Sequence, residues 1–167
     1  RIYEALKKIG KSDIELVMNL QGDEPLMNVE DIKNLHSHMV KSKYKLGTLA
    51  SNIVDKNFYK KESVVKVITK EKLNHNSFPE AINFMRNLTI PGENIYHHLG
   101  IYCYHIETLK NFVTLNQSQN EIKNKLEQMR ALDNNIKINV AYASGSSIGV
   151  DTKEDFVAIK KLMEYKS

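Results

Sequence analysis

Two aspartates stand where an α/β protein would carry ligand-binding carboxylates. Asp23 directly follows the apolar run 14–20, which has the length of a strand, and Asp151 lies between the predicted strand 136–143 and the last helix. Ligands in open α/β sheets bind beyond the carboxyl ends of the strands. Two carboxylates from separate loops at one such edge could hold Mg²⁺, which takes few protein oxygens and keeps positions for phosphate.

Both aspartates also fit ordinary structural roles. Asp23 can be a turn residue before Pro25, and Asp151 can cap the helix that follows it, because Asp favours turns and caps. Gly22 strengthens the ligand-binding interpretation of Asp23, since a glycine lets the backbone approach a ligand closely. Spacing alone leaves both interpretations open.

A second group of candidates lies in the strand-like run 98–104. Period-two alternation places His98, Gly100, Tyr102 and Tyr104 on one face of that strand. With a gap at Gly100, this face could form a pocket wall. A packed aromatic face of the core fits the same pattern equally well.

Other residues of reactive type favour structural roles. Glu127 and Gln128 are adjacent in a predicted helix, where an exposed helix edge is the usual explanation. Cys103 is the single cysteine, which excludes an internal disulfide, fits a reducing compartment and, given its apolar neighbours, indicates a buried strand residue. His97 and His98 point to opposite faces of a strand, which disfavours a metal site built from that pair.

Composition is that of an ordinary globular protein. Hydrophobic residues make up 41% of the chain and charged residues 26%, and the net charge is +4. The basic residues form no block, which gives little support to nucleic-acid binding. A mild basic excess would suit an enzyme of anionic sugars and nucleotides, but a lysine-rich surface that keeps the chain in solution explains the bulk charge more simply. No apolar run approaches the roughly 18 residues of a membrane span. With no secretory signal pattern in residues 1–167, we expect a cytoplasmic protein that does not insert into a membrane.

The elements that position these residues alternate along the chain. The expected strands cover 14–20, 44–52, 63–69, 98–104 and 136–143. The expected helices cover 1–9, 29–39, 107–113, 121–132 and a last segment opened by Thr152. Their expected buried stripes are Val29, Ile32, Leu35 and Met39, then Ile122, Leu126, Met129 and Leu132, and finally Phe156, Ile159, Leu162 and Met163. This alternation predicts a single α/β domain over residues 1–167, with a mixed sheet flanked by helices.

Four segments resemble, in order and at similar intervals, the signatures of CMP-Kdo synthetases (3-deoxy-manno-octulosonate cytidylyltransferases). They are QGDEP at 21–25, HLGIY at 98–102, LEQMR at 126–130 and GVDTKEDF at 149–156. Related sugar cytidylyltransferases share QGDEP in looser form, but the set of four is specific and covers essentially the whole chain. The resemblance implies a nucleotide-diphospho-sugar transferase-like, Rossmann-like fold.

The resemblance also implies a reaction and a set of roles. The anomeric hydroxyl of Kdo would attack the α-phosphate of CTP, giving CMP-Kdo and pyrophosphate for lipopolysaccharide biosynthesis, which requires in-line positioning and charge neutralisation. Asp23 and Asp151 would act as catalytic ligands of Mg²⁺, Arg1 would lie on the nucleotide side, and the enzyme would be a homodimer. The residues that match positions around Kdo are Gln21, Arg86, His98, Tyr102, Glu127 and Gln128.

The sequence departs from the family pattern in several places. The family's first strand and its arginine- and lysine-bearing phosphate loop have no counterpart in residues 1–167. The chain is therefore expected to be a part truncated at the N-terminus, inactive alone, with a separate N-terminal chain as one conceivable partner. Met85 replaces the Ser that usually precedes Arg86. The alternatives are a non-catalytic remnant that binds a sugar acid or a partner, and a CMP-sialic acid synthetase-like enzyme.

Overall fold

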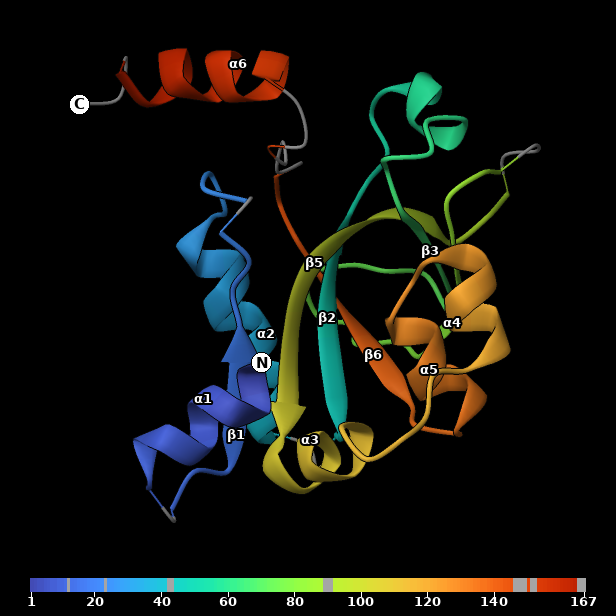
Figure 1. Ribbon diagram of the computed structural model, residues 1–167. Coiled ribbons are helices and arrows are strands. Elements are labelled where there is room, and N and C mark those ends of the chain that lie inside the picture. The colour runs from blue at the N-terminus through green and yellow to red at the C-terminus, as the bar shows by residue number, and fades with distance from the viewer. Residues whose placement is uncertain are drawn as a thin grey trace.

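The fold is built on a mixed β-sheet (Figure 1). The computed structural model describes residues 1–11, 13–22, 24–41, 44–88, 92–145, 150 and 153–164. The strands follow the order β4-β3-β5-β2-β6, and β1 also pairs with β5. Their bounds are β1 Leu16–Asn19, β2 Leu46–Ser51, β3 Lys66–Thr69, β4 Ala81–Met85, β5 Ile95–His105 and β6 Ile138–Tyr142. The predicted α/β class is confirmed.

Four strands of the sheet, β1, β2, β3 and β6, point in the same direction. Strands β1 and β2 both run antiparallel to β5, and β6 runs parallel to β2. The carboxyl ends of β1, β2 and β6 therefore meet at one edge of the sheet. The loops that follow these strands are in position to share a ligand site.

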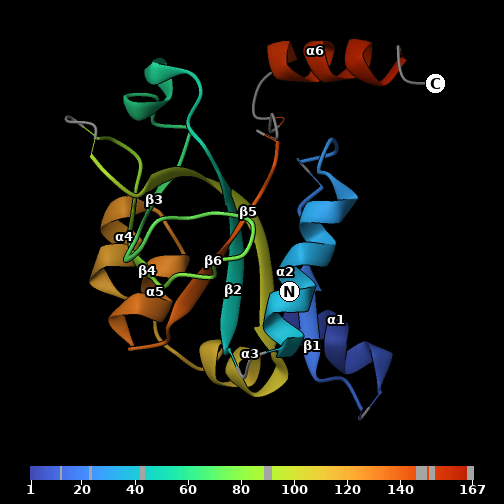
Figure 2. The same ribbon diagram turned by 180° about the vertical axis from the view of Figure 1, so that it is seen from behind.

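Helices cover both faces of the sheet (Figure 2). On one face, Leu35 and Met39 of one helix pack against Leu49 of β2. On the other, Phe112 and Met129 belong to a second apolar cluster. None of the described helices is both long and apolar enough to cross a membrane. The helices are α1 Ile2–Ile9, α2 Val29–Lys41, α3 Ile106–Phe112, α4 Gln119–Asn124, α5 Gln128–Asp133 and α6 Lys153–Glu164, with a 3₁₀ turn η1 at Lys56–Tyr59.

Local signals fix several element ends. Helix α1 stops at Gly10, whose φ of 66° is the left-handed conformation that glycine adopts without strain. At the start of α2, the side-chain Oδ1 of Asn28 accepts a hydrogen bond from the N–H of Glu30 at 2.9 Å. Ser118 opens α4 with a reciprocal capping box to Glu121.

The single helix expected over 121–132 is wrong. The structure contains two short helices, and Lys125 between them has a φ of 53°, which ends α4. The carbonyl oxygens of Asn124 and Lys125 accept hydrogen bonds from the Arg86 guanidinium at 3.2 and 3.1 Å instead of continuing a helix. A tertiary contact therefore overrides the local helical pattern.

The predicted buried stripes are confirmed only in part. Leu35, Met39, Leu126, Met129 and Ile159 are buried, and Ile32 and Leu132 are half-buried. Val29, Ile122 and Phe156 were expected inside but are 60%, 61% and 58% exposed. Val29 is the first residue of α2, and Ile122 belongs to the short helix that Lys125 ends, so neither follows the periodicity of a long helix. The side chains of Leu162 and Met163 lie outside the described residues.

Two strands differ from expectation. The run 14–20 was predicted as a central strand, but all four residues of β1 are half-buried and, among the described strands, β1 pairs only with β5. Strand β4 was missed. Its pairing with β3 shifts register between Ile68 and Thr69, so buried residues fall at Ala81 and Phe84 and do not follow the period of two.

Candidate active site

The loops that follow β1 and β6 are joined by hydrogen bonds. Asn28 Nδ2 donates to Ser144 Oγ at 3.3 Å. Asn28 lies five positions after Asp23, and Ser144 lies seven positions before Asp151. Both aspartates lie outside the described residues, so their convergence stays a prediction, but the segments that carry them start from the same edge of the sheet.

Asp31 strengthens this junction. Its side chain is only 5% exposed, although it is ionisable and lies in the first turn of α2. Its carboxylate accepts hydrogen bonds from the Ser144 backbone N–H at 3.0 and 3.1 Å and from Ser144 Oγ at 3.0 and 3.3 Å. The sequence placed Asp31 near the start of α2 but gave no sign of a partner 113 residues away.

The loop after β1 also touches β5. The pairing of β2 with β5 shifts after Thr48, where Gly100 and Ile101 are extra residues on β5. The N–H of Gly100 donates to Glu24 Oε1 at 3.1 Å. A Cβ atom on Gly100 would lie 3.0 Å from the side-chain Cδ of Gln21, so the Gln21 side chain lies close over Gly100 and would have to shift for a larger residue. Glu24 Oε2 is buried without a partner among the described residues.

His98 and Tyr102 belong to a row of aromatic side chains. The ring centroids are 5.0 Å apart for Phe84–His98, 5.5 Å for His98–Tyr102, and 6.0 Å for both Tyr102–Tyr104 and Tyr104–Phe112. His98 is 7% exposed and Tyr102 9%. The shared face predicted for this run is confirmed, and in this structure it is a packed aromatic face.

The hydrogen bonds of Thr48 define the tautomer of His98. Thr48 Oγ1 is 2.7 Å from the Ile101 carbonyl oxygen and 2.9 Å from His98 Nε2. A hydroxyl has one proton, and the carbonyl can only accept it. His98 Nε2 therefore donates to Thr48, which leaves Nδ1 of the neutral ring as an acceptor.

Burial fixes the ionisation state of this row. Burial, and secondarily His97, lowers the pKa of His98 to about 3, so its ring is neutral at physiological pH. Burial, then Tyr104 and Glu127, raises the pKa of Tyr102 well above its usual value, so its hydroxyl keeps its proton. The contribution of Glu127 shows that this carboxylate lies on the same side of the fold as the two tyrosines.

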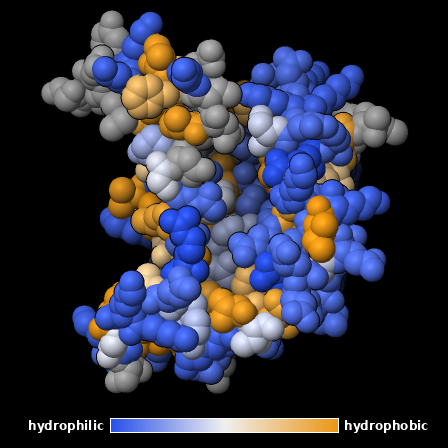
Figure 3. All heavy atoms as spheres, in the orientation of Figure 1, coloured by the Kyte–Doolittle hydropathy of each residue, from blue (hydrophilic) through white to orange (hydrophobic). Residues whose placement is uncertain are grey.

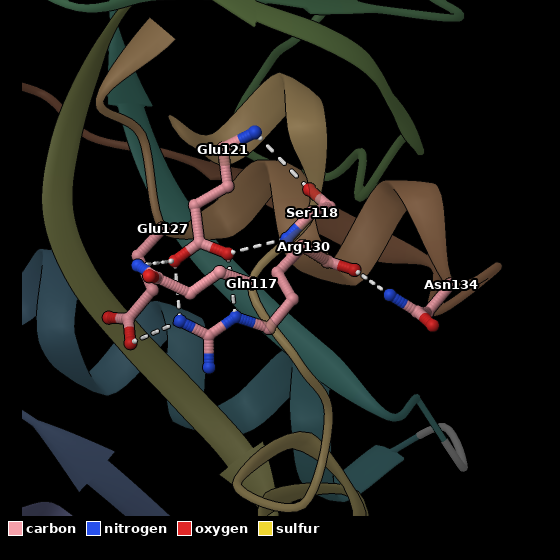
Figure 4. A network of polar contacts seen from close by, with 6 residues as sticks. All are labelled: Gln117, Ser118, Glu121, Glu127, Arg130 and Asn134. Atoms are coloured by element: carbon pink, nitrogen blue, oxygen red, sulfur yellow. Dashed lines mark hydrogen bonds and ion pairs between the residues drawn. The ribbon is translucent and has the colours of Figure 1, made fainter. Parts of the chain in front are cut away.

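Glu127 is held by a polar network at the junction of α4 and α5 (Figure 4). Arg130 contacts the nearly buried Glu121 through Nη2–Oε1 at 2.5 Å and Nε–Oε2 at 2.8 Å. The same Nη2 is 3.6 Å from Glu127 Oε1. The Glu127 side chain is nevertheless 70% exposed, so it is tethered but open to solvent, and Gln128 beside it is half-buried.

Arg86 secures the turn just before Glu127. Its guanidinium donates to the carbonyl oxygens of Asn124, Lys125 and Glu62, the last at 3.0 Å. These bonds use three of the five N–H groups of a guanidinium. Arg86 therefore lies in the predicted region of the site, with most of its donors committed to the backbone.

Most of the predicted substrate-binding residues lie near β5, but Arg1 does not. The Gln21 side chain lies over Gly100 of β5, between His98 and Tyr102 along the strand. The charge of Glu127 acts on Tyr102, and Arg86 binds the backbone of the turn just before Glu127. Arg1 stands exposed at the start of α1, with its amino group 3.7 Å from Glu4 Oε2. Figure 3 shows a hollow over β5 and β2, between the β1–α2 side and the α4–α5 side, with mostly hydrophilic side chains around it.

Known proteins resemble this chain over nearly its full length. A family model described as "Cytidylyltransferase" matches residues 1–138. The curated 3-deoxy-manno-octulosonate cytidylyltransferase of Bartonella henselae is 36% identical over 165 residues, which cover 98% of this chain and 67% of the relative. The chain belongs to the cytidylyltransferase family. The enzyme of the same name from Thermodesulfovibrio yellowstonii is 37% identical over 173 residues, covering 98% of this chain and 68% of the relative.

Solved structures agree with this assignment. A CMP:2-keto-3-deoxy-manno-octonic acid synthetase complexed with CTP matches with a TM-score of 0.84 and 26% identity, covering 99% of this chain and 68% of that one. A 4-diphosphocytidyl-2C-methyl-D-erythritol synthase from Anaerococcus prevotii, at TM-score 0.59 and 14% identity over 97% of this chain and 64% of that one, shares the fold alone. The predicted family, nucleotidyltransferase class and fold are confirmed. This cytidylyltransferase chain spans about two thirds of the length of its relatives.

Proposed function

We propose that this protein transfers a cytidylyl group from CTP to 3-deoxy-manno-octulosonate (Kdo), giving CMP-Kdo and pyrophosphate for lipopolysaccharide biosynthesis. The observation that carries the proposal is the match over 98% of the chain to curated enzymes with this sugar acid in their name. The solved relative that contains CTP supports the nucleotide.

The reaction requires positioning more than a covalent intermediate. The anomeric oxygen of Kdo forms a bond to the α-phosphorus of CTP, and the bond from that phosphorus to the bridging oxygen breaks. Pyrophosphate leaves with the electron pair, and the hydroxyl proton passes to solvent. The protein's task is to align the two oxygens and to offset the phosphate charge.

The donor set at the sheet edge suits Mg²⁺. We propose Asp23 and Asp151 as its ligands, since oxygen donors are what this hard cation selects. Two observations support the fit: the Asn28–Ser144 hydrogen bond joins the flanking segments, and Glu24 Oε2 is a buried oxygen without a partner among the described residues. When bound, Mg²⁺ supplies charge neutralisation at the phosphates.

Kdo is the ligand that the polar groups beside β5 would receive. The Nδ1 atom of neutral His98 can accept a hydrogen bond from a sugar hydroxyl, and the Tyr102 hydroxyl retains its proton. The exposed carboxylate of Glu127 can accept further hydroxyl donors. Gln21, Arg86 and Gln128 complete the proposed sugar site, and Arg1 is assigned to the nucleotide.

A turnover assay tests the proposal. The 167-residue polypeptide is incubated with CTP, Kdo and Mg²⁺, alone and with the remaining third of the Bartonella henselae relative added in trans, and CMP-Kdo and pyrophosphate are measured. We expect slow turnover alone and a rise with the added segment, with Kdo preferred over sialic acid. Absence of Kdo binding and of turnover under both conditions would refute the proposal.

The Thr48–His98 hydrogen bond provides a sharper test of the sugar site. Thr48→Val preserves shape but removes the acceptor for His98 Nε2–H, so the tautomer is no longer fixed. We expect Kdo affinity to fall about 3- to 10-fold, as for loss of one hydrogen bond. Isothermal titration measures the affinity, and ¹⁵N shifts of the His98 ring report the tautomer.

Thr69→Val is the matched control for this experiment. Thr69 is also a buried strand threonine, and its Oγ1 donates to the Glu71 carbonyl oxygen at 2.7 Å. We expect its loss to leave Kdo affinity unchanged. If both variants changed Kdo affinity equally, His98 would not be part of the sugar site.

We further propose that the enzyme acts as a cytoplasmic homodimer. The proposal follows from the family resemblance, and exposed apolar side chains such as Ile82 and Val54, at 58% and 85% exposure, offer contact area. Sedimentation at micromolar concentration is expected to show a dimer. A stable monomer would contradict it.

A further inference from the structure

Lys66 is a buried lysine without a counter-charge. Its side chain is 0% exposed, the largest fully buried side chain among those described. The Nζ atom donates to the carbonyl oxygens of Lys61 at 2.9 Å, Val64 at 2.7 Å and Arg86. Within the described part of the chain, no carboxylate forms an ion pair with it. A buried ammonium is costly even when fully hydrogen-bonded, so this arrangement calls for a reason beyond packing.

The three carbonyls connect Lys66 to the predicted sugar site. Two belong to the turn 61–64 before β3, and the third belongs to Arg86 at the end of β4. The Arg86 side chain in turn binds Glu62 in the same turn and the residues just before Glu127. Two adjacent cations therefore fix the turn, the end of β4 and the α4–α5 junction relative to one another.

We propose that Lys66 is a positioning residue of the Kdo site. Its ammonium holds the backbone at Arg86 and the turn 61–64, and this keeps the Arg86 guanidinium against the junction that presents Glu127. The inference rests on the proposed function. Lys66 itself does not touch the substrate, because it is enclosed.

The ammonium is needed because it has one N–H for each carbonyl. Burial, and secondarily Arg86, lowers the pKa of Lys66 to about 8. A neutral amine has two N–H groups, so one carbonyl loses its donor as the pH rises through this value. The titratable side chains whose charges interact with that of Lys66 are Arg86 and His97.

The neighbouring His97 does not change charge in the same pH range. Burial, and secondarily Lys66, lowers the pKa of His97 to about 4, so it stays neutral from pH 7 to 9. A guanidinium keeps its charge throughout that range. If Kdo affinity changes between pH 7 and 9 in the wild type but not in a Lys66 variant, the change is due to loss of the Lys66 proton.

Stability and affinity are expected to change in opposite directions. The folded pKa of Lys66 is below its unfolded value, so the unfolded state binds more protons above pH 8, and stability rises with pH there. Kdo affinity is expected to fall over the same interval, because the positioning bonds are lost. If Lys66 only stabilised the fold, Kdo affinity would rise with pH together with the free energy of unfolding.

The experiment compares Kdo binding by isothermal titration in the wild type, Lys66→Met and Lys66→Arg from pH 7 to 9. For Lys66→Met we expect an affinity loss of about 10-fold or more at pH 7, as for lost hydrogen bonds to a charged group. Lys66→Arg keeps its charge and should retain affinity without the wild type's decline above pH 8. Hydrogen exchange should increase at 61–64 and 124–128 in Lys66→Met.

Two variants control for charge and for stability. Lys70→Met removes an exposed lysine just beyond β3, and Val67→Ala removes buried volume next to Lys66. Both should leave Kdo affinity and its pH profile unchanged. If Lys66→Met does not fold, the comparison of wild type with Lys66→Arg remains a test. The inference then requires that Kdo affinity falls above pH 8 in the wild type and not in Lys66→Arg.

The outcomes separate the inference from the proposed function. Equal Kdo affinity in the wild type and Lys66→Met, or a wild-type affinity that is constant from pH 7 to 9, would overturn the role of Lys66 alone. A matching affinity loss in Val67→Ala would do the same, because it would show a general effect of stability. No Kdo binding by the wild type would overturn the proposed function together with this inference.

Discussion

Replacing Arg130 by methionine is expected to lower the free energy of unfolding by about 3–5 kcal/mol. That is the cost of removing one partner from a buried ion pair, because the remaining charge stays in a poorly solvated place. The Arg130 and Glu121 side chains are 13% and 6% exposed, and two short contacts join them. Arg130 also lies over the Phe112 ring at 5.0 Å, so packing is lost as well. Urea unfolding at pH 7 measures the change.

An exposed pair provides the control for this prediction. Lys110 and Glu107 contact at 2.8 Å, but their side chains are 48% and 67% exposed. Such surface pairs contribute little to stability, because solvent screens them. Lys110→Met is therefore expected to have little effect on unfolding. If Arg130→Met is equally mild, the buried pair does not hold α4 to α5.

Acid should weaken the same pair. The hydrogen bond from Arg130 lowers the pKa of the Glu121 carboxyl below its usual value. A carboxyl with a depressed pKa in the folded state contributes stability above its unfolded pKa of roughly 4.3 and loses that contribution as the pH falls through the folded value. Unfolding of the wild type should therefore become easier below about pH 4, and Glu121→Gln should show a smaller change over that range.

Short-range patterns predicted much of the fold. Gly10 ends α1 because glycine adopts the left-handed conformation without strain, and Asn28 caps α2 because its side-chain oxygen accepts a hydrogen bond from a backbone N–H of the first turn. Alternation along β5 placed His98, Tyr102 and Tyr104 on one face. These features depend on residues only a few positions apart, so the sequence carries them directly.

The contacts that assemble the site are long-range and were not predictable from spacing. Glu24 meets Gly100 across 76 positions, and Arg86 meets Lys125 across 39. The second of these ends α4, where periodicity alone predicted a continuous helix. For Asp23 and Asp151, on which the metal hypothesis depends, spacing left two interpretations open and the family resemblance favoured metal binding; both residues lie outside the described residues.

Asp31 is the residue through which the predicted metal loops can be tested. Asp31→Ala leaves the Ser144 N–H and Oγ–H without their acceptor, and each hydrogen bond to a charged group contributes about 1.5–3 kcal/mol. Because Ser144 is exposed and its donors can turn to water, we expect a net loss of only about 2–3 kcal/mol in the free energy of unfolding. Because the bonds also anchor the segment before Asp151, apparent Mg²⁺ affinity should fall about 10- to 100-fold, as for outer partners of metal ligands.

Three variants distinguish a local from a general effect of Asp31. Ser144→Ala removes only the hydroxyl, so its losses should be smaller than those of Asp31→Ala. Asp133→Ala removes an exposed aspartate whose Oδ1 accepts from Asn120 Nδ2 at 2.9 Å, and it should change neither property. Mg²⁺ titration of turnover and protease cleavage between 144 and 153 give independent readouts. Loss of stability in Asp31→Ala with unchanged Mg²⁺ dependence and cleavage would show that the junction only supports the fold, and would separate Asp31 from the proposed metal site.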